Sequence, residues 1–238
     1  SRQRDFGGNW ARLEARLGGD ELLPAALGSS RAAVVVLGHT RWASVGIISE
    51  ANAHPLDQAE VSRLVGSYAA AALNGDVDNY AELVGLHQLA LAPEITTDAK
   101  VIPALLARGV DAGQQPVDAF RDAVATFEGS VAIGAHSSAA PGQVFLALRG
   151  SGQGLYIGIA EDAFVVASEP YGLVEETHTY LRLDGETPAN PDHPGASRGQ
   201  IVVLDATEAG GLAGIRRLSY DGTELPVTDA DFVHAEIT

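Results

Sequence analysis

The sequence contains neither cysteine nor methionine among its 238 residues. Without cysteine, these residues can form no disulfide, no thiolate zinc site and no thiol nucleophile. Because methionine is lacking, we expect that Ser1 is not the start of a primary translation product and that the chain is trimmed, processed or incomplete at its N-terminus. Long apolar runs are lacking as well. Even runs such as Ala32–Leu37 are far too short to span a bilayer.

Basic residues are scarce. The 15 lysines and arginines stand against 31 aspartates and glutamates, which leaves a formal charge of −16. Such a surface repels phosphate backbones and anionic lipid, so nucleic acid and membranes are poor partners. The seven histidines show no paired metal-ligand spacing, and neither a metal nor another cofactor is expected. No basic segment followed by an apolar one opens the chain, so a cytoplasmic protein is expected.

What the chain does contain is typical of a globular α+β domain. Apolar residues make up 46% and charged residues 19% of the sequence. The N-terminal stretch predicts helix broken at Gly18-Gly19, and helices are also predicted after Asp78 and Asp98, which can cap them. Pro116 stands where a first-turn proline belongs, and the apolar face that follows it predicts a further helix.

Strands are predicted from short apolar runs bounded by turn residues. Ala32–Leu37 predicts a buried strand, and Ser67–Leu73 predicts a second that ends at the turn-forming Asn74-Gly75. Hairpins in sequence give antiparallel sheets, so this order of elements predicts two layered sheets with helices outside. Six more strands are predicted: Val131–Ala135, Val144–Leu148, Leu155–Ile159, Ala163–Ala167, Thr179–Leu183 and Gln200–Leu204.

Three constellations could carry chemistry, and each has a common structural alternative. Arg41 follows the first predicted strand, where its planar fork could bind a carboxylate with the Ser44 hydroxyl; alternatively, it is a surface arginine paired with an acid. Asn74 and Gly75 could aim an amide and a backbone N–H at one oxygen, as in an oxyanion hole, or form an ordinary turn. Asp98 could bind a ligand ammonium or simply cap its helix.

Together, the arginine, the amide–glycine pair and the aspartate could bind an α-amino acid at both charged ends. Weaker candidates are His54, in the turn Asn52–Pro55, and Ser1, whose free α-amine could serve as its base. The stretch Gly150–Gly154 lies between two predicted strands, so we interpret it as a hairpin loop rather than a phosphate cradle.

Four short motifs follow one another along the chain. They are His39-Thr40-Arg41-Trp42-Ala43, Asn52-Ala53-His54-Pro55, Leu73-Asn74-Gly75 and Thr97-Asp98. In this order they resemble the class II glutamine amidotransferase domain of glucosamine-6-phosphate synthase, also called glutamine–fructose-6-phosphate aminotransferase. Each motif alone is unspecific, but the ordered set is specific. The similarity extends from about His39 to the C-terminus, including the later strands.

The resemblance implies an N-terminal-nucleophile hydrolase fold, an αββα sandwich of two mainly antiparallel sheets between helices, here lacking its N-terminal strands. It also implies glutaminase activity: glutamine is hydrolysed to glutamate and ammonia, which a sugar-phosphate isomerase domain of the same polypeptide transfers to a sugar phosphate such as fructose 6-phosphate. The roles implied by matching position are α-carboxylate binding for Arg41 and Ser44, α-ammonium binding for Asp98, pocket shaping for Trp42, and the oxyanion hole for Asn74 and Gly75.

Three departures from the family pattern affect the expected activity. The family's initial Cys-Gly-Ile, which supplies the nucleophile, is not in the chain, so the amidotransferase domain 1–238 is expected to be N-terminally incomplete and inactive as it stands. Ser44-Val45-Gly46 replaces the frequent Thr-His-Gly, so Val45 leaves a histidine's role vacant. The sugar isomerase domains are absent from the chain, and the ammonia acceptor and any homo-oligomer stay open.

Three functions are compatible with these residues. The first is part of an active amidotransferase whose nucleophile belongs to the parent polypeptide. The second is a catalytically dead domain retained for glutamine binding or interdomain contacts. The third is a related amidotransferase with another acceptor, against which Trp42 and the Asn-Ala-His-Pro turn argue.

Overall fold

The computed structural model describes residues 6–28, 34–40, 45–61, 66–188 and 198–234. The chain divides into two compact units, Ser1–Val34 and Val35–Thr238. The first unit contains α1 (Phe6–Gly18) and α2 (Leu22–Leu27), so the predicted helical stretch and its break are confirmed. Within the described ranges, no helix combines the length and apolar character needed to cross a bilayer.

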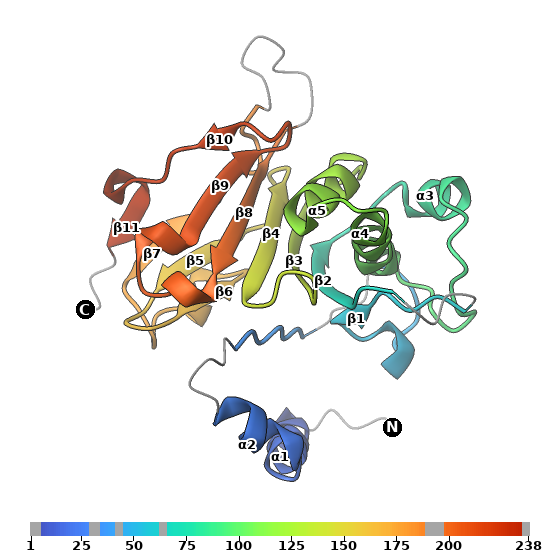
Figure 1. The fold of residues 1–238 in the computed structure, drawn as a ribbon, viewed down its shortest axis with the longest axis horizontal. Helices are drawn as coiled ribbons and strands as arrows, with labels where there is room; N and C mark the ends of the chain where they lie inside the picture. The colour runs from blue at the N-terminus through green and yellow to red at the C-terminus, as the bar shows by residue number, and fades with distance from the viewer. Residues whose placement is uncertain (1–5, 29–33, 41–44, 62–65, 189–197, 235–238) are drawn as a thin grey trace. The chain divides into compact units, whose positions relative to one another are not determined.

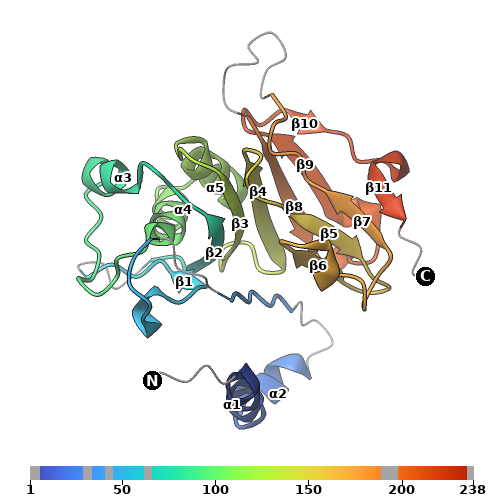
Figure 2. The same ribbon diagram turned by 180° about the vertical axis from the view of Figure 1, so that it is seen from behind.

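Two antiparallel sheets form the second unit (Figure 1). The larger sheet has the strand order β1-β2-β3-β4-β8-β9-β10, and the smaller has the order β11-β7-β5-β6 (Figure 2). The larger comprises β1 (Leu56–Asp57), β2 (Ala69–Gly75), β3 (Val131–Ser137), β4 (Gln143–Arg149), β8 (Gln200–Asp205), β9 (Ile215–Ser219) and β10 (Glu224–Leu225). The smaller comprises β5 (Tyr156–Ile159), β6 (Phe164–Ala167), β7 (Thr179–Arg182) and β11 (Phe232–His234).

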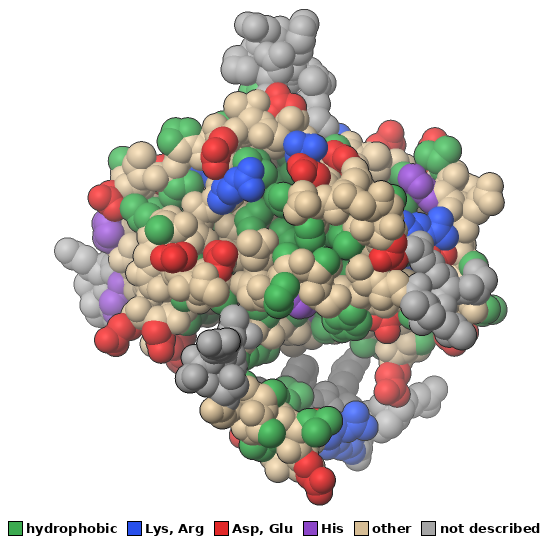
Figure 3. All heavy atoms as spheres, in the orientation of Figure 1, with side chains coloured by type: hydrophobic (Ala, Val, Ile, Leu, Met, Phe, Trp, Pro, Cys, Tyr) green, Lys and Arg blue, Asp and Glu red, His purple; other side chains and the backbone are tan. Residues whose placement is uncertain are grey.

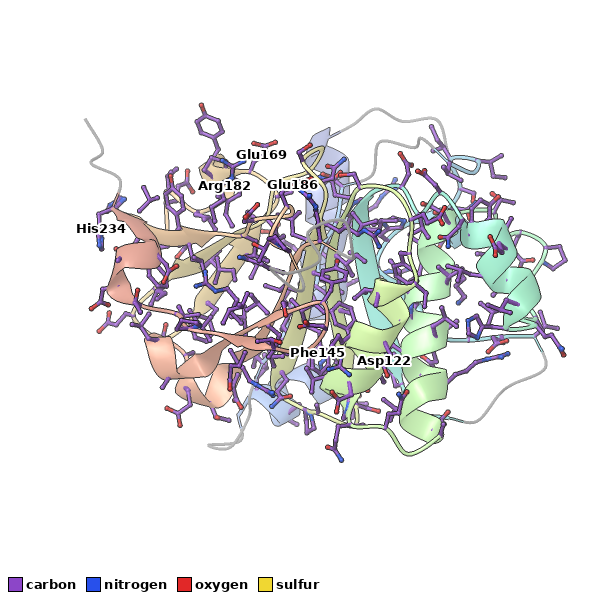
Figure 4. The ribbon with its side chains drawn as sticks, turned by 90° about the horizontal axis from the view of Figure 1, so that it is seen from above. Asp122, Phe145, Glu169, Arg182, Glu186 and His234 are labelled. Atoms are coloured by element: carbon purple, nitrogen blue, oxygen red, sulfur yellow. The ribbon has the colours of Figure 1, made fainter. Side chains whose placement is uncertain are left out.

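Alternation along β4 shows how the layers are built. Successive side chains of a strand point to opposite faces of its sheet. Phe145 and Ala147 belong to the core beneath the helices, whereas Leu146 and Leu148 belong to the core between the two sheets. Phe145 stacks on Phe120 with ring centroids 5.7 Å apart, on the helix side of the larger sheet (Figure 4). The helices of this layer are α3 (Tyr80–Leu86), α4 (Val101–Asp111) and α5 (Pro116–Ala125).

The predicted strands are confirmed wherever a partner strand exists. All six runs after Gly129 form strands, and Pro116 opens α5 as expected. The predicted buried strand Ala32–Leu37 is wrong in its described part, because no strand includes residues 34–37 and Val36 is 87% exposed. A valine-rich run becomes a buried strand only when a neighbouring strand takes its backbone hydrogen bonds, and neither sheet provides one here.

Three local interpretations are also corrected. The N-cap of α3 is Asn79, not Asp78. Asp98 does not cap a helix with its side chain; it opens a 3-10 turn, Asp98–Lys100, that leads into α4. The stretch Gly150–Gly154 is no hairpin loop, because it connects β4 of the larger sheet to β5 of the smaller. In each case, contacts distant in sequence outweighed the local pattern.

A buried lysine ties the turn Asp98–Lys100 to the edge strand β1. The side chain of Lys100 is 1% exposed, and its ammonium donates to the Asp57 backbone oxygen at 2.7 Å and to Asp57 Oδ1 at 3.0 Å. Asp57 itself is 53% exposed. Burial acts to raise the pKa of Asp57, but the bonds from Lys100 and the Ala59 amide outweigh it and lower that pKa.

Because Lys100 is buried and Asp57 is half exposed, removing one or the other should change the free energy of unfolding by different amounts. Asp57→Ala should destabilise the fold by about 3–5 kcal/mol, because it leaves a buried ammonium without its counter-charge. Lys100→Met should cost less, since water can solvate the half-exposed Asp57 carboxylate. Urea unfolding of both variants at neutral pH would measure this, and an equal loss in the two would contradict the asymmetry.

Candidate functional site

The end of β2 presents the predicted amide–glycine pair. Asn74 and Gly75 are strand residues paired with Ala132 and Val131 of β3, so the interpretation as an ordinary Asn-Gly turn is wrong. Asn74 is exposed, and its side chain makes no hydrogen bond to any residue that the structure describes. Gly75 has φ +107°, and a Cβ there would lie 2.0 Å from the Ser130 backbone oxygen, so only glycine fits.

The backbone N–H of Gly75 faces the open edge of β2. Asp76 donates its amide to the Ser130 oxygen of the neighbouring β3 side at 3.1 Å, so the even-numbered residues of β2 bond toward β3. Backbone groups of alternate residues point to opposite sides of a strand. Gly75 therefore points away from β3, and β1 pairs only with Ala70 and Ala71 farther back. No residue that the structure describes accepts a hydrogen bond from the Gly75 amide at this edge.

His54 lies at the same edge. Its Nδ1 is 3.1 Å from the Leu73 oxygen and 3.3 Å from the Leu73 nitrogen, where a further strand would otherwise pair. The ring of His39 lies against it, with centroids 4.6 Å apart. His54 was a sequence candidate, whereas His39 was quoted only as part of a motif. The structure therefore places two imidazoles one residue back along β2 from Asn74.

Asp98 is held at this end of β2 by a distant backbone contact. It is 3% exposed, and its Oδ2 accepts the Val77 amide at 2.7 Å, while Oδ1 accepts the Thr97 hydroxyl at 3.3 Å. Burial raises the pKa of Asp98, and the nearby Asp76 raises it further, against the lowering effect of these hydrogen bonds. A buried carboxylate whose ionisation is disfavoured gains most from a cationic ligand.

Other predicted site residues lie outside the described residues. They are Arg41, Trp42 and Ser44, the expected partners of the α-carboxylate and the pocket wall. The region just before them is described: Leu37 approaches Gly134 of β3 on the face of the larger sheet turned away from α4. The Arg41 segment therefore continues from a stretch that lies over the sheet face that also carries Asn74.

Two residues near the site were not predicted from the sequence. Gln153 lies beside Gly75, with its Cγ 3.2 Å from where a Gly75 Cβ would stand, although 150–154 had been interpreted as a hairpin loop. Asn52 is fully buried and bonds to Ser49 and to Thr96, two residues before Asp98. Its position in the Asn-Ala-His-Pro motif was the available signal. No spacing pattern marked Gln153.

The described groups near Asn74 offer hydrogen-bonding partners for an oxygen and for an ammonium. Among the described residues, no group of three or more histidine, aspartate or glutamate side chains could hold a metal ion. Acidic side chains on the face in Figure 3 are spread out rather than gathered. An exposed side-chain amide, a backbone N–H that bonds to no described residue, and a buried carboxylate offer two donors for an oxygen and one counter-charge for an ammonium.

Comparison with known sequences identifies relatives. Glutamine–fructose-6-phosphate aminotransferase [isomerizing] of Bacillus anthracis is 33% identical over 153 residues, which is 64% of this chain and 24% of that protein. The protein of the same name from Bacillus subtilis is 29% identical over 147 residues. The chain thus spans about a quarter of the length of the curated relatives it matches. No protein-family model matches the chain.

Comparison with solved structures identifies the fold. Glutamine phosphoribosylpyrophosphate amidotransferase from B. subtilis superposes with a TM-score of 0.54 at 21% identity, covering 76% of this chain and 34% of that one. An allosteric regulatory enzyme of purine biosynthesis gives a TM-score of 0.50, also at 21% identity, covering 71% of this chain and 31% of that one. The fold is that of the N-terminal-nucleophile glutamine amidotransferases, as the sequence predicted. In sequence, the chain is similar over 64% of its length to the glutamine–fructose-6-phosphate aminotransferases, so the resemblance stated from its motifs is confirmed.

Proposed function

We propose that the chain is the glutamine-binding part of a glutamine amidotransferase of the glutamine–fructose-6-phosphate aminotransferase kind. The observation that carries the proposal is the hydrogen bond between Asp98 and the Val77 amide, which brings an aspartate to the strand end that presents Asn74 and Gly75. An ammonium partner and two amide donors thereby converge from segments more than 20 residues apart. An α-amino acid with a side-chain carbonyl matches that set.

In the proposed complex, Asp98 binds the α-ammonium of glutamine, and Arg41 with Ser44 binds the α-carboxylate. Trp42 shapes the pocket. The side-chain carbonyl oxygen accepts from Asn74 Nδ2 and the Gly75 amide, and both bonds strengthen as that oxygen becomes negative. Losing one such donor typically lowers the rate by about 10²–10³.

Amide hydrolysis also needs a nucleophile, which the family takes from a cysteine. None of the 238 residues is a cysteine, so the chain as given should bind glutamine without releasing ammonia. The alternative function, a catalytically dead glutamine-binding or interdomain domain, rests on the same observation. The coding sequence before Ser1 separates the two, since Cys-Gly-Ile there favours an active parent enzyme. A sugar-phosphate isomerase domain, a sugar-phosphate acceptor and a homo-oligomer remain proposals about the parent protein.

Calorimetry with L-glutamine tests the proposal on the chain as given. We expect one-to-one binding with no ammonia released, and a loss of roughly 10- to 100-fold in affinity on Arg41→Ala, because a hydrogen-bonded charge contributes about 1.5–3 kcal/mol. Arg216→Ala is the matched control, since Arg216 is half exposed and pairs with Glu224 on β9 and β10. If L-glutamine did not bind, or if Arg41→Ala bound it equally well, the proposal would be wrong.

A further inference from the structure

A single buried amide joins two loops behind the proposed site. Asn52 is 0% exposed, and both ends of its carboxamide are bonded. The oxygen Oδ1 accepts the amides of Thr96 at 2.8 Å and Thr97 at 3.2 Å. The nitrogen Nδ2 has two hydrogens to donate and lies within hydrogen-bond distance of four acceptors: Ser49 Oγ at 3.0 Å, Thr96 Oγ1 at 3.1 Å, the Ile47 oxygen at 3.2 Å and the Glu94 oxygen at 3.3 Å.

The two loops also touch directly. Ile47 donates its amide to Thr96 Oγ1 at 3.2 Å. Gly46 has φ +83°, and a Cβ on it would lie 2.8 Å from the Thr96 backbone oxygen. Residues 46–49 and 94–97 therefore pack backbone to backbone, with Asn52 as their shared hydrogen-bonding partner.

One of these loops leads straight to Asp98. Thr97, whose amide is held by Asn52, donates its hydroxyl to Asp98 Oδ1 at 3.3 Å. The other loop continues in sequence from Arg41–Ser44. Asn52 thus contacts the segment that ends at the proposed ammonium partner and the segment that begins just after the proposed carboxylate partners.

We infer that Asn52 is a positioning residue that fixes residues 94–97 against residues 46–49 and so holds Asp98, the proposed ammonium partner, in place. The inference rests on the proposed function, and it assigns Asn52 no contact with the ligand. A fully bonded amide suits this task, because losing any one of its bonds leaves a buried polar group unsatisfied.

The decisive variant is Asn52→Asp. The carboxylate of this variant has nearly the shape of the carboxamide and can still accept hydrogen bonds from the amides of Thr96 and Thr97. It has no N–H to donate, so it faces the backbone oxygens of Ile47 and Glu94 without a hydrogen bond. We expect a loss of about tenfold in affinity for L-glutamine, corresponding to the loss of one to two ordinary hydrogen bonds. Binding of 5-amino-5-oxopentanoate, which lacks the α-amino group and so makes no use of Asp98, should change far less. The ratio of the two affinities should therefore fall about tenfold, which general destabilisation would not produce.

Gln200→Glu is the matched control. Gln200 is also buried, at 6% exposure, and its amide also bridges a loop, accepting from the Asp184 amide at 3.1 Å and donating to Thr187 Oγ1 at 2.9 Å. It lies on β8, three strands from β2 in the sheet order. This variant should leave the affinity ratio unchanged. Thr96→Val, at an exposed position, is the milder second variant if Asn52→Asp does not fold, and it should shift the ratio in the same direction.

Amide hydrogen exchange gives a readout independent of glutamine. In Asn52→Asp or Thr96→Val, the amides of Ile47, Thr96 and Thr97 should exchange faster than in the wild type. If the wild type binds glutamine but the ratio and exchange stay unchanged, the inference is wrong and the proposed function stands. If the wild type binds no glutamine, the proposed function fails, and unchanged exchange would then show that Asn52 does not join the loops either.

Discussion

Asp98→Asn should weaken glutamine binding by roughly 10- to 100-fold while making the ligand-free protein more stable at neutral pH. The affinity falls because a hydrogen-bonded counter-charge for the ammonium is removed, a contribution of about 1.5–3 kcal/mol. The stability rises because Asp98 is 3% exposed and its pKa is raised, chiefly by burial. The variant's neutral side chain can still accept the Val77 amide without burying a charge.

The sign of the pH effect follows from that raised pKa. A group whose pKa is higher in the folded state contributes stability below its unfolded pKa, and this contribution is lost as pH rises through the folded pKa. The stability difference between Asp98→Asn and the wild type should therefore be largest near pH 7 and shrink as the pH falls toward the ordinary aspartate range. Urea unfolding at a series of pH values measures it.

The glutamine affinity of the wild type should change with pH in the opposite direction to the stability that Asp98 contributes: it should fall as the pH falls. As the pH falls through the raised pKa of Asp98, protonation removes the counter-charge of the ammonium, so affinity for the wild type declines. The Asp98→Asn variant should lack this decline. Asp205→Asn is the control: the Thr207 bonds lower the pKa of Asp205, so that substitution should cost stability and leave glutamine affinity unchanged. Equal pH profiles for the wild type and Asp98→Asn would rule out the assigned role.

Gly75→Ala should lower both stability and glutamine affinity. The backbone there has φ +107°, which alone costs an L-residue about 1–3 kcal/mol, and the added Cβ would lie 2.0 Å from the Ser130 oxygen. Relieving that clash requires the end of β2 to move away from β3, which displaces Asn74 and the Gly75 amide together. Chemical unfolding and glutamine calorimetry would measure the two losses.

Gly113→Ala separates the two causes. Gly113 follows α4 with φ +95°, but among the described residues no atom beyond its own chain neighbours lies within 4 Å of where its Cβ would stand. This variant therefore carries the backbone strain without the clash. Gly75→Ala should be the more destabilising of the pair, and only it should weaken glutamine binding. If both cost the same stability and neither affected binding, the strand end would not be the constrained part of a site.

The strands after Gly129 and the helix opened by Pro116 could be predicted because their signals are local. Apolar alternation along β4 encodes which side chains face the helices and which face the smaller sheet, before any partner is known. The short strands β1, β9, β10 and β11 were not predicted. With two to five residues each, they depend on their neighbours' backbone more than on their own pattern.

In the candidate site too, the sequence predicted some features, while others depended on contacts between distant segments. Residue chemistry at the predicted strand and helix ends selected Asn74, Gly75 and Asp98, and motif order indicated the class of protein to which comparison then related the chain. The local sequence pattern predicted the wrong secondary structure at two of these places: a turn at Asn74-Gly75 and a helix cap at Asp98. Asn74-Gly75 is instead a strand end, because 74 and 75 pair with β3.

The sequence by itself determined the kind of side chain available: no cysteine, no metal cluster pattern, and an arginine, an amide–glycine pair and an aspartate in a specific order. Only the tertiary structure decided that the Asp98 carboxylate turns to the Val77 amide, 21 residues away, and that Asn52 holds the loop before it. Hydrogen bonds between distant segments form only after the chain has folded, so no local pattern records them. These contacts hold the aspartate at the strand end that carries Asn74 and Gly75.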